Sequence, residues 1–204
     1  MDIDFDTIYQ GTGIPWDIAA AQPAVVEWEA AGRFAGAVLD VGCGLGDNAA
    51  YLASRGHAVT AVDAAPAAIE RARDRARGLP VTFAVADAFA LPEAGRYDTV
   101  LDSALYHCLP PERRAAYAAG LARFARPGAR LNLLGVSDRA PEGTPPSRVT
   151  ERALREHLTA AGWTISALRP HTITSVIPPE LGLDLPVDAD GRTRIPAWAV
   201  EAVR

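Results

Sequence analysis

Short apolar runs alternate with amphipathic stretches along most of the chain, and this pattern predicts strands that alternate with helices. The apolar runs cover residues 37–41, 58–63, 81–87, 97–103 and 129–137. The stretches that predict helices cover residues 47–56, 66–78 and 111–125, and another short helix begins at residue 23. This alternation indicates a parallel sheet with helices on both faces.

After residue 137 the regular alternation ends. Residues 138–149 are typical of a loop, and residues 150–162 predict a helix with Thr150 as its N-cap. A long strand is expected from Trp163, followed by a loop over residues 178–193. The final segment, RIPAWAVEAVR, is predicted to be a strand rather than a helix because Pro196 and the β-branched residues disfavour a helix.

The composition is that of an ordinary globular domain, with 204 residues of which 49% are hydrophobic and 22% charged. The net charge of −5 and the scattered arginines count against a nucleic-acid partner. No apolar run reaches the length of a membrane span, and MDIDFDTIYQ lacks the profile of a signal peptide. Cys43 and Cys108 do not make a disulfide framework or a zinc site, so no metal is expected. We expect a cytoplasmic protein, a monomer or a homodimer, that binds a small molecule.

The stretch LDVGCGLGDN places Gly42, Gly44 and Gly46 directly after the first strand. The carboxyl end of that strand is where open α/β folds bind ligands. The spacing G-x-G-x-G differs from the dinucleotide pattern, and Asp47 stands where the third glycine of that pattern belongs. A carboxylate at the start of a helix would repel a pyrophosphate. No lysine and serine or threonine follow the glycines, so a P-loop is excluded.

A ligand that has a cation and no phosphate fits this loop better, and S-adenosylmethionine (SAM) is such a ligand. Four predicted strands each end near an aspartate, namely Asp40, Asp63, Asp87 and Asp102. Asp63 stands at the distance where an acidic residue grips a ribose diol, and Asp87 could accept from an adenine amino group. A single aspartate at a strand end is most often a turn residue, but four at one edge favour a ligand site.

The segments LDVGCGLGDN, AVDAAP, VADAFALP and YDTVLDSALYHCL resemble the successive motifs of class I SAM-dependent methyltransferases. The resemblance implies a Rossmann-like α/β fold with a mostly parallel sheet of order 3-2-1-4-5-7-6. It divides a single domain, residues 1–204, into an N-terminal segment at 1–33 that acts as a lid, a SAM-binding core at 37–136 and substrate-side elements at 137–204. It also implies SAM as cofactor, S-adenosylhomocysteine (SAH) as product, and cofactor contacts from Tyr9, Trp16, Asp40, Gly42, Gly44, Gly46, Asp63, Ala64, Asp87, Ala88, Asp102 and Ser103.

Two flanking stretches narrow the resemblance. IYQGTGIPWDIAAAQPAV is similar to the Pro-Trp-Asp segment of halide and thiol methyltransferases, although a glycine is expected after Trp-Asp-Ile and is absent here. DSALYHCLPPERR and RIPAW resemble bacterial heterocyclic-toxin methyltransferases. That resemblance implies methyl transfer to oxygen or nitrogen of a small hydroxylated heteroaromatic, such as a quinolone. An aromatic face of Tyr9 or Trp16 beside the sulfonium would gain about 0.5–2 kcal/mol by cation–π attraction; alternatively, Trp16 only packs the N-terminus onto the domain.

On the acceptor side the candidate residues are Trp16, Tyr106 and His107. His107 is the candidate catalytic base because an imidazole titrates near neutrality, although it could equally pack beneath a loop. A base is dispensable if alignment of an activated sulfonium supplies most of the rate. His57 and His157 are expected at the surface, and His171 in the sixth strand is a weaker candidate for the pocket. The rest of the pocket wall is expected from the entry segment before the core, the loop after the fifth strand and the apolar stretch 178–194.

Three alternatives stay open at this point. One is the same chemistry with a thiol or halide acceptor. The others are a SAM-binding module without catalysis and an NAD-dependent oxidoreductase. The G-x-G-x-G spacing and Asp47 count against NAD.

Overall fold

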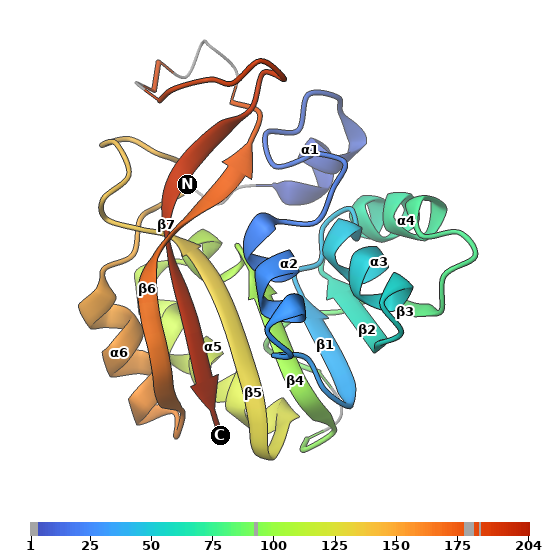
Figure 1. Cartoon of the computed structure of the whole chain (residues 1–204), viewed down its shortest axis with the longest axis vertical. Coiled ribbons are helices and arrows are strands. Elements are labelled where there is room, and N and C mark those ends of the chain that lie inside the picture. The colour runs from blue at the N-terminus through green and yellow to red at the C-terminus, as the bar shows by residue number, and fades with distance from the viewer. Residues whose placement is uncertain (1–3, 92–93, 178–181, 184) are drawn as a thin grey trace.

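A seven-stranded sheet forms the centre of the computed structural model, which describes residues 4–91, 94–177, 182–183 and 185–204 (Figure 1). The strands are β1 Ala37–Val41, β2 Ala58–Asp63, β3 Val81–Val85, β4 Tyr97–Ser103, β5 Ala125–Val136, β6 Thr164–Ser175 and β7 Thr193–Val203. Their order is β3-β2-β1-β4-β5-β7-β6, and β7 runs antiparallel to both of its neighbours. The predicted fold class and strand order are therefore confirmed, as is the prediction that the last segment is a strand.

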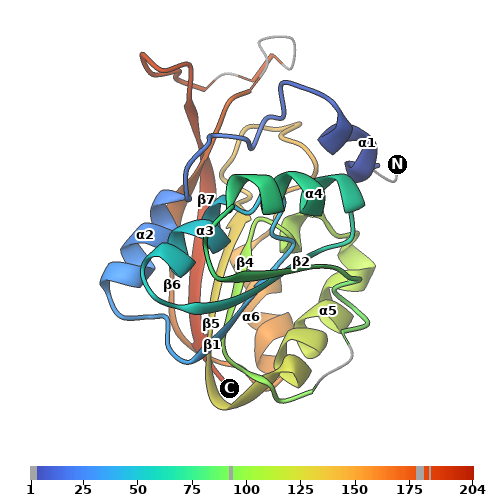
Figure 2. The ribbon, with the colours of Figure 1, turned by 90° about the vertical axis from the view of Figure 1, so that its right-hand side faces the viewer.

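Helices cover both faces of this sheet (Figure 2). On one face lie α2 Pro23–Ala30, α3 Asp47–Ser54 and α4 Pro66–Arg75; on the other lie α5 Pro111–Phe124 and α6 Glu151–Ala160. Thr150 is the N-cap of α6, as predicted, because its side chain accepts from the amide of Ala153 at 3.1 Å. Two elements were not predicted: α1 Phe5–Gln10 and the short 3₁₀ helix η1 Tyr106–Cys108.

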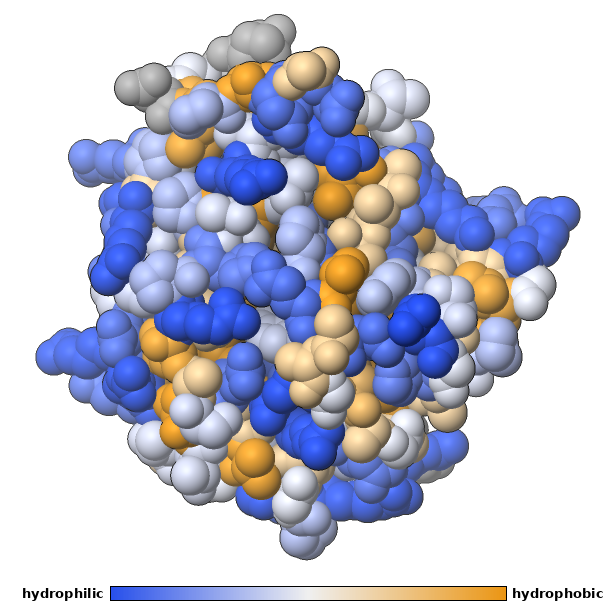
Figure 3. All heavy atoms as spheres, viewed as in Figure 1, coloured by the Kyte–Doolittle hydropathy of each residue, from blue (hydrophilic) through white to orange (hydrophobic). Residues whose placement is uncertain are grey.

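The central strands are apolar on both sides because helices bury both faces. In β1, Leu39 and Val41 pack in the cluster under α5, whereas Val38 packs in the cluster under α2 and α3. All three side chains are fully buried. On the face shown in Figure 3, hydrophobic residues form small groups among hydrophilic ones. Within the described part of the chain, no helix combines the length and the apolar character that crossing a membrane needs.

Strands β6 and β7, which are antiparallel to each other, extend beyond the ends of the other strands. β5 ends at Val136, which pairs with Ala197 of β7, whereas β6 and β7 stay paired up to Ser175 and Thr193. Ile173 and Ile195 face each other in this extension. The N-terminal segment and α1 lie at the same end of the molecule (Figure 1), so that a wall stands on each side of the carboxyl ends of the parallel strands.

Candidate active site

A cavity of about 770 Å³ lies at the carboxyl ends of the parallel strands, between the N-terminal segment and the extension of β6 and β7. Eight of the predicted site residues that line it come from four parts of the chain. They are Tyr9, Trp16, Gly42, Gly44, Asp63, Ala64, Asp87 and Ala88. Ser103 and His107 line it as well. The fold thus brings these ten residues together.

Close contacts with neighbouring side chains constrain the glycine loop as much as its place at the cavity does. A Cβ atom on Gly42 would lie 2.9 Å from the side chain of Leu105, and one on Gly44 would lie 2.7 Å from the hydroxyl of Tyr9. The φ of Gly44 is +53°, a conformation that residues with a Cβ rarely adopt. Glycine therefore allows the loop to line the cavity while Tyr9 packs against it.

Gly46 has a different place from the other two glycines. It is not in the cavity wall, and a Cβ there would meet Ala72 at 2.9 Å and Phe83 at 3.0 Å. This glycine lets the start of α3 approach α4 and β3, and its predicted cofactor contact stays a prediction.

Asp63 joins the glycine loop to the start of α4. Its Oδ2 accepts from the amide of Gly44 at 2.9 Å, and its Oδ1 accepts from the amide of Ala65 at 3.0 Å. Burial is the largest influence on this carboxyl and raises its pKa. Each carboxylate oxygen can accept more than one hydrogen bond, so the side chain keeps capacity for a ligand.

The third strand leads to a more exposed part of the wall. Asp87 is exposed, and its Oδ1 accepts from the amide of Phe89 at 2.9 Å. The guanidinium carbon of Arg113 lies 3.9 Å from the centroid of the Phe89 ring, and both residues line the cavity. Sequence reasoning missed both residues; the position of Phe89 two residues after Asp87 was the available signal.

Backbone strain and an unpaired hydroxyl mark the end of β4. Ser103 lines the cavity, and its hydroxyl is buried without a hydrogen-bond partner. Ala104 has a φ of +82°, and its amide donates to the carbonyl of Leu134 at 2.9 Å. A non-glycine residue with positive φ is uncommon, and such strain tends to occur at functional sites.

Asp102 is buried behind this wall and does not line the cavity. It accepts from the amide of Leu105 at 2.8 Å, from the amide of Tyr106 and from the hydroxyl of Tyr117 at 2.9 Å. Burial raises its pKa to about 6. These hydrogen bonds to the carboxylate fix the turn before η1, and the predicted cofactor contact of Asp102 stays a prediction.

Tyr106 is also outside the cavity wall, and its predicted place at the acceptor stays a prediction. The side chain is fully buried, and its hydroxyl lies 2.6 Å from Nδ1 of His157. His157 is therefore half-buried and in contact with η1, although we expected it at the surface. His171 is likewise directed elsewhere, since its Nε2 lies 3.1 Å from Glu27.

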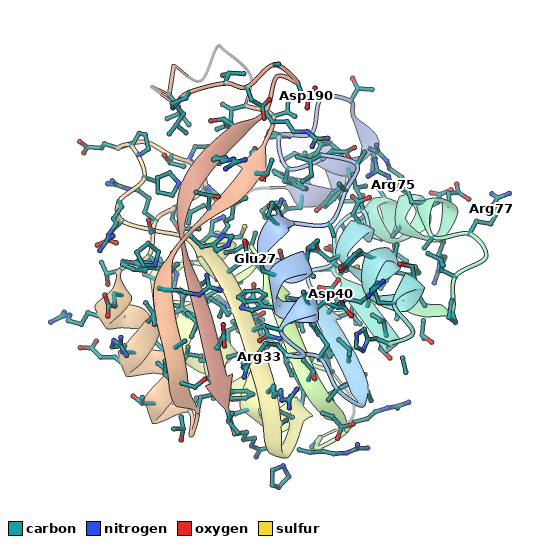
Figure 4. The ribbon with its side chains drawn as sticks, viewed as in Figure 1. Glu27, Arg33, Asp40, Arg75, Arg77 and Asp190 are labelled. Carbon is teal, nitrogen blue, oxygen red and sulfur yellow. The ribbon has the colours of Figure 1, made fainter. Side chains whose placement is uncertain are left out.

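Asp40 lies in the interior of the molecule, on β1 (Figure 4). Neither carboxyl oxygen has a hydrogen-bond partner, and the side chain is absent from the cavity wall. Burial, reinforced by the charges of Asp102 and Asp63, raises its pKa to about 8. The predicted contact of Asp40 with the cofactor stays a prediction.

His107 lies in the wall on η1 and is 5% exposed. Its Nδ1 is buried without a partner, and its Nε2 lies 3.9 Å from Sγ of Cys108. Burial, with a smaller contribution from the charge of Arg114, lowers its pKa to about 3. The expectation of titration near neutrality is therefore wrong, and the imidazole is a neutral group with an unused hydrogen-bonding nitrogen.

The N-terminal segment closes the cavity through aromatic packing. Tyr9 is 6% exposed, and its hydroxyl accepts from Nε1 of Trp16 at 3.0 Å. The two ring centroids are 5.7 Å apart in an edge-on arrangement. Burial raises the pKa of the Tyr9 hydroxyl well above its usual value. Trp16 therefore both packs the segment onto the domain and lines the cavity.

Charged contacts hold the same segment against α4 and α3. Asp17 pairs with Arg75 at 2.6 Å, and Arg75 also pairs with Asp47 at 2.9 Å. Figure 4 shows Arg75 where α4 meets the N-terminal segment. In addition, Arg71 donates to the carbonyl of Tyr9 at 2.8 Å.

Another part of the cavity wall is mostly apolar; the loop after β5 contributes to it, as expected, whereas sequence reasoning missed its strand residues Ile173 and Ile195. It consists of Leu109, Val136, Thr144, Pro145, Pro146, Ile173, Ile177 and Ile195. The residues of the predicted loop wall at 178–181 and 184 lie outside the described residues, and Leu183 and Leu185 are absent from the wall.

Known proteins resemble this chain over both the core and the flanks. Residues 38–128 match the family model described as methyltransferase domain. The 2-heptyl-1-hydroxyquinolin-4(1H)-one methyltransferase of Mycobacteroides abscessus is 41% identical over 163 residues, 76% of this chain and 71% of that protein.

Two solved structures extend the likeness to three dimensions. One, from work on the conversion of a disulfide bond into a thioacetal group during echinomycin biosynthesis, is 39% identical with a TM-score of 0.86, covering 100% of this chain and 93% of that one. The other is the Burkholderia thailandensis 1,6-didemethyltoxoflavin-N1-methyltransferase with bound 1,6-didemethyltoxoflavin and SAH. It is 26% identical with a TM-score of 0.70, covering 98% of this chain and 85% of that one.

Proposed function

The chain belongs to the class I SAM-dependent methyltransferases of small molecules, and we propose that it methylates an oxygen or nitrogen atom of a small hydroxylated heteroaromatic acceptor. The observation that carries the proposal is the combination of residues in the cavity wall. One part of the wall is the glycine loop with Asp63, and another is His107 with apolar residues from the loop after β5 and from the β6–β7 extension. The volume of about 770 Å³ is in the upper part of the range of ligand pockets, about 300–1,000 Å³, and leaves room for a cofactor and an acceptor.

The first part of the wall has the donor and acceptor groups that SAM requires. The backbone of Gly42 and Gly44 lies at the wall, where Cβ atoms would clash, and a ligand can approach it closely. We assign the ribose hydroxyls to Asp63 and Ala64, and the adenine to Asp87 and Ala88. The buried, unpaired hydroxyl of Ser103 is available to the methionine part.

The acceptor lies against the apolar wall in this proposal. Flat heteroaromatic rings bury well against proline and isoleucine side chains, at about 25 cal/mol for each Å² of apolar surface. A hydroxyl or ring nitrogen on such a molecule needs a polar partner in the wall. Nδ1 of His107 is buried and unpaired, and we assign that partnership to it. In this proposal Trp16, in the N-terminal segment, covers the acceptor and His107.

The chemistry is an in-line displacement in which positioning supplies most of the rate. When bound, SAM supplies a methyl group on a positively charged sulfur, and the C–S electron pair remains on sulfur to give neutral SAH. The acceptor's proton passes to solvent, before transfer if its hydroxyl is acidic. With a pKa of about 3, His107 orients the acceptor through a hydrogen bond and does not serve as the base.

A sulfur acceptor is the second candidate. Its support is the 39% identity, over the whole chain, to the structure from work on thioacetal formation during echinomycin biosynthesis. The predictions that this protein is cytoplasmic, binds no nucleic acid and is a monomer or homodimer stay predictions.

The test begins with calorimetric titration of SAM, SAH and NAD into the wild type and Asp63→Ala. We expect binding of SAM and SAH, a loss in the variant, and no binding of NAD. The protein with SAM is then given hydroxyquinolones, other hydroxylated heteroaromatics and small thiols, and products are identified by mass spectrometry. Methylated heteroaromatics support the proposal; methylated thiols alone would replace it with the second candidate.

A further inference from the structure

Arg114, on α5, is a buried cation without an acidic partner among the described residues. It is 5% exposed, and its three hydrogen bonds go to uncharged oxygens. Burying a guanidinium in this way is costly, because carbonyl and hydroxyl dipoles replace both water and a counter-charge. Burial accordingly lowers the pKa of Arg114. A buried charge at this cost is expected to have a structural or functional role.

The hydrogen bonds of Arg114 join two parts of the cavity wall. Nε donates to the carbonyl of Leu109 at 3.1 Å, and Nη2 donates to the hydroxyl of Ser147 at 2.5 Å. Nη2 is also 3.5 Å from the carbonyl of His107, and that carbonyl accepts from the hydroxyl of Ser147 as well. The carbonyl of His107 is thus held from two sides.

Each anchor is adjacent to a residue that lines the cavity. Leu109 and His107 line it directly, and Ser147 follows the wall residues Pro145 and Pro146. Arg114 itself does not line the cavity, so it acts on a bound acceptor only through these neighbours. The planar guanidinium of Arg114 has several N–H donors and can bond three oxygens at once. A lysine ammonium on its flexible chain would hold these oxygens less rigidly.

We propose that Arg114, together with Ser147, is a positioning residue that fixes the imidazole of His107 and the 144–146 wall relative to each other at the acceptor's side of the cavity. The proposal rests on the proposed function in treating this side as the acceptor's. It does not depend on which atom is methylated. The charge of Arg114 also helps to keep the imidazole neutral, as its effect on the pKa of His107 indicates.

The experiment compares Arg114→Met, Arg114→Lys, Ser147→Ala and Ser147→Thr with the wild type, and Arg126→Met is the matched control. Arg126 pairs with Asp98 on the exposed surface and is absent from the cavity wall. We measure kcat and KM for the acceptor, the Kd of SAH by calorimetry, and the melting temperature. The ring nitrogens of the four histidines are followed by ¹⁵N NMR of the SAH-bound protein, with His107 assigned through His107→Gln.

We expect kcat/KM for the acceptor to fall about 10- to 100-fold in Arg114→Met, because small misplacements have such effects. The Kd of SAH stays within twofold, and the His107 ring signals shift. Ser147→Ala gives a smaller fall, Ser147→Thr and Arg114→Lys recover part of the rate, and the double variant Arg114→Met/Ser147→Ala is no worse than Arg114→Met, as for one network. Arg126→Met leaves all of these unchanged.

Unmoved His107 signals with kcat/KM within twofold of the wild type would overturn the inference. So would a parallel loss of SAH affinity, melting temperature and rate, which indicates a general structural role. Absence of methylated heteroaromatics with the wild type defeats the proposed function instead. In that case the His107 signals in the SAH-bound variants still decide the inference.

Discussion

Gly44→Ala separates the backbone requirement of the glycine loop from its role at the cavity. The new Cβ would lie 2.7 Å from the hydroxyl of Tyr9, in a residue whose φ is +53°. The left-handed conformation costs alanine about 1–2 kcal/mol. Displacing the Tyr9 hydroxyl breaks its hydrogen bond with Trp16, worth about 0.5–1.5 kcal/mol. Together these two costs come to about 1.5–3.5 kcal/mol.

Gly32→Ala is the matched control, because its φ is +67° and a Cβ there meets nothing within 4 Å. Only the backbone cost applies to it. For a chain of this size 1 kcal/mol corresponds to about 2–4 °C in melting temperature. We therefore expect Gly44→Ala to melt several degrees below Gly32→Ala in differential scanning calorimetry.

Binding supplies the second half of this test. Gly44→Ala should raise the Kd of SAM at least tenfold by calorimetric titration, whereas Gly32→Ala should leave it unchanged. Tyr9→Phe removes the atom nearest the new methyl, so the stability cost of Gly44→Ala should shrink in that background while the loss of SAM affinity persists. Equal melting temperatures of the two alanine variants would refute the contact argument, and unchanged SAM affinity in Gly44→Ala would refute its place at the cofactor.

Three further outcomes follow from charges in the structure. The pKa of Asp40 is raised from 3.8 to about 8, so the folded protein retains a proton that the unfolded chain releases above pH 4; stability should fall as pH rises from 4 to 8. Asp40→Asn should therefore melt higher than the wild type at pH 9 with a smaller difference at pH 5, and a constant difference would contradict this sign. Arg75→Met, which removes the ion pairs with Asp17 and Asp47, should speed SAH release several-fold in stopped-flow experiments, whereas Arg77→Met, from an exposed pair in the turn after this helix, should not. If both variants release SAH at the wild-type rate, the N-terminal segment is not held by this pair. Because the pKa of the His107 imidazole is about 3, the rate of acceptor turnover should not change stepwise near pH 6.5 on account of this residue. If the wild type shows a step near pH 6.5 and His107→Gln lacks it, His107 is the base.

The alternation of apolar and amphipathic stretches was enough to predict the parallel sheet and the edge where the cavity lies, whereas the strand order was implied by the resemblance of the motifs to class I SAM-dependent methyltransferases. Parallel strands place their carboxyl ends together, so Gly42, Gly44, Asp63 and Asp87 could be assigned to one site before any coordinates. These are local features, because each residue's place follows from its position in one strand or turn.

What each side chain does at that edge depended on contacts between distant segments. Asp102 and Asp63 both end strands, but the amides after β4 and the hydroxyl of Tyr117 draw Asp102 into the interior. His107 has an ordinary sequence context, and only its burial beside Arg114 lowers its pKa to about 3.

The apolar wall has the same origin, since Ile173 and Ile195 reach the cavity through pairing between strands that begin far apart in the chain. The sequence by itself determined the alternating α/β architecture and the edge where the cavity lies, because those follow from periodicity and from the direction of parallel strands. The tertiary structure alone decided which polar groups face the cavity and in what protonation state, because burial and competition for hydrogen bonds depend on segments that meet only in the folded chain.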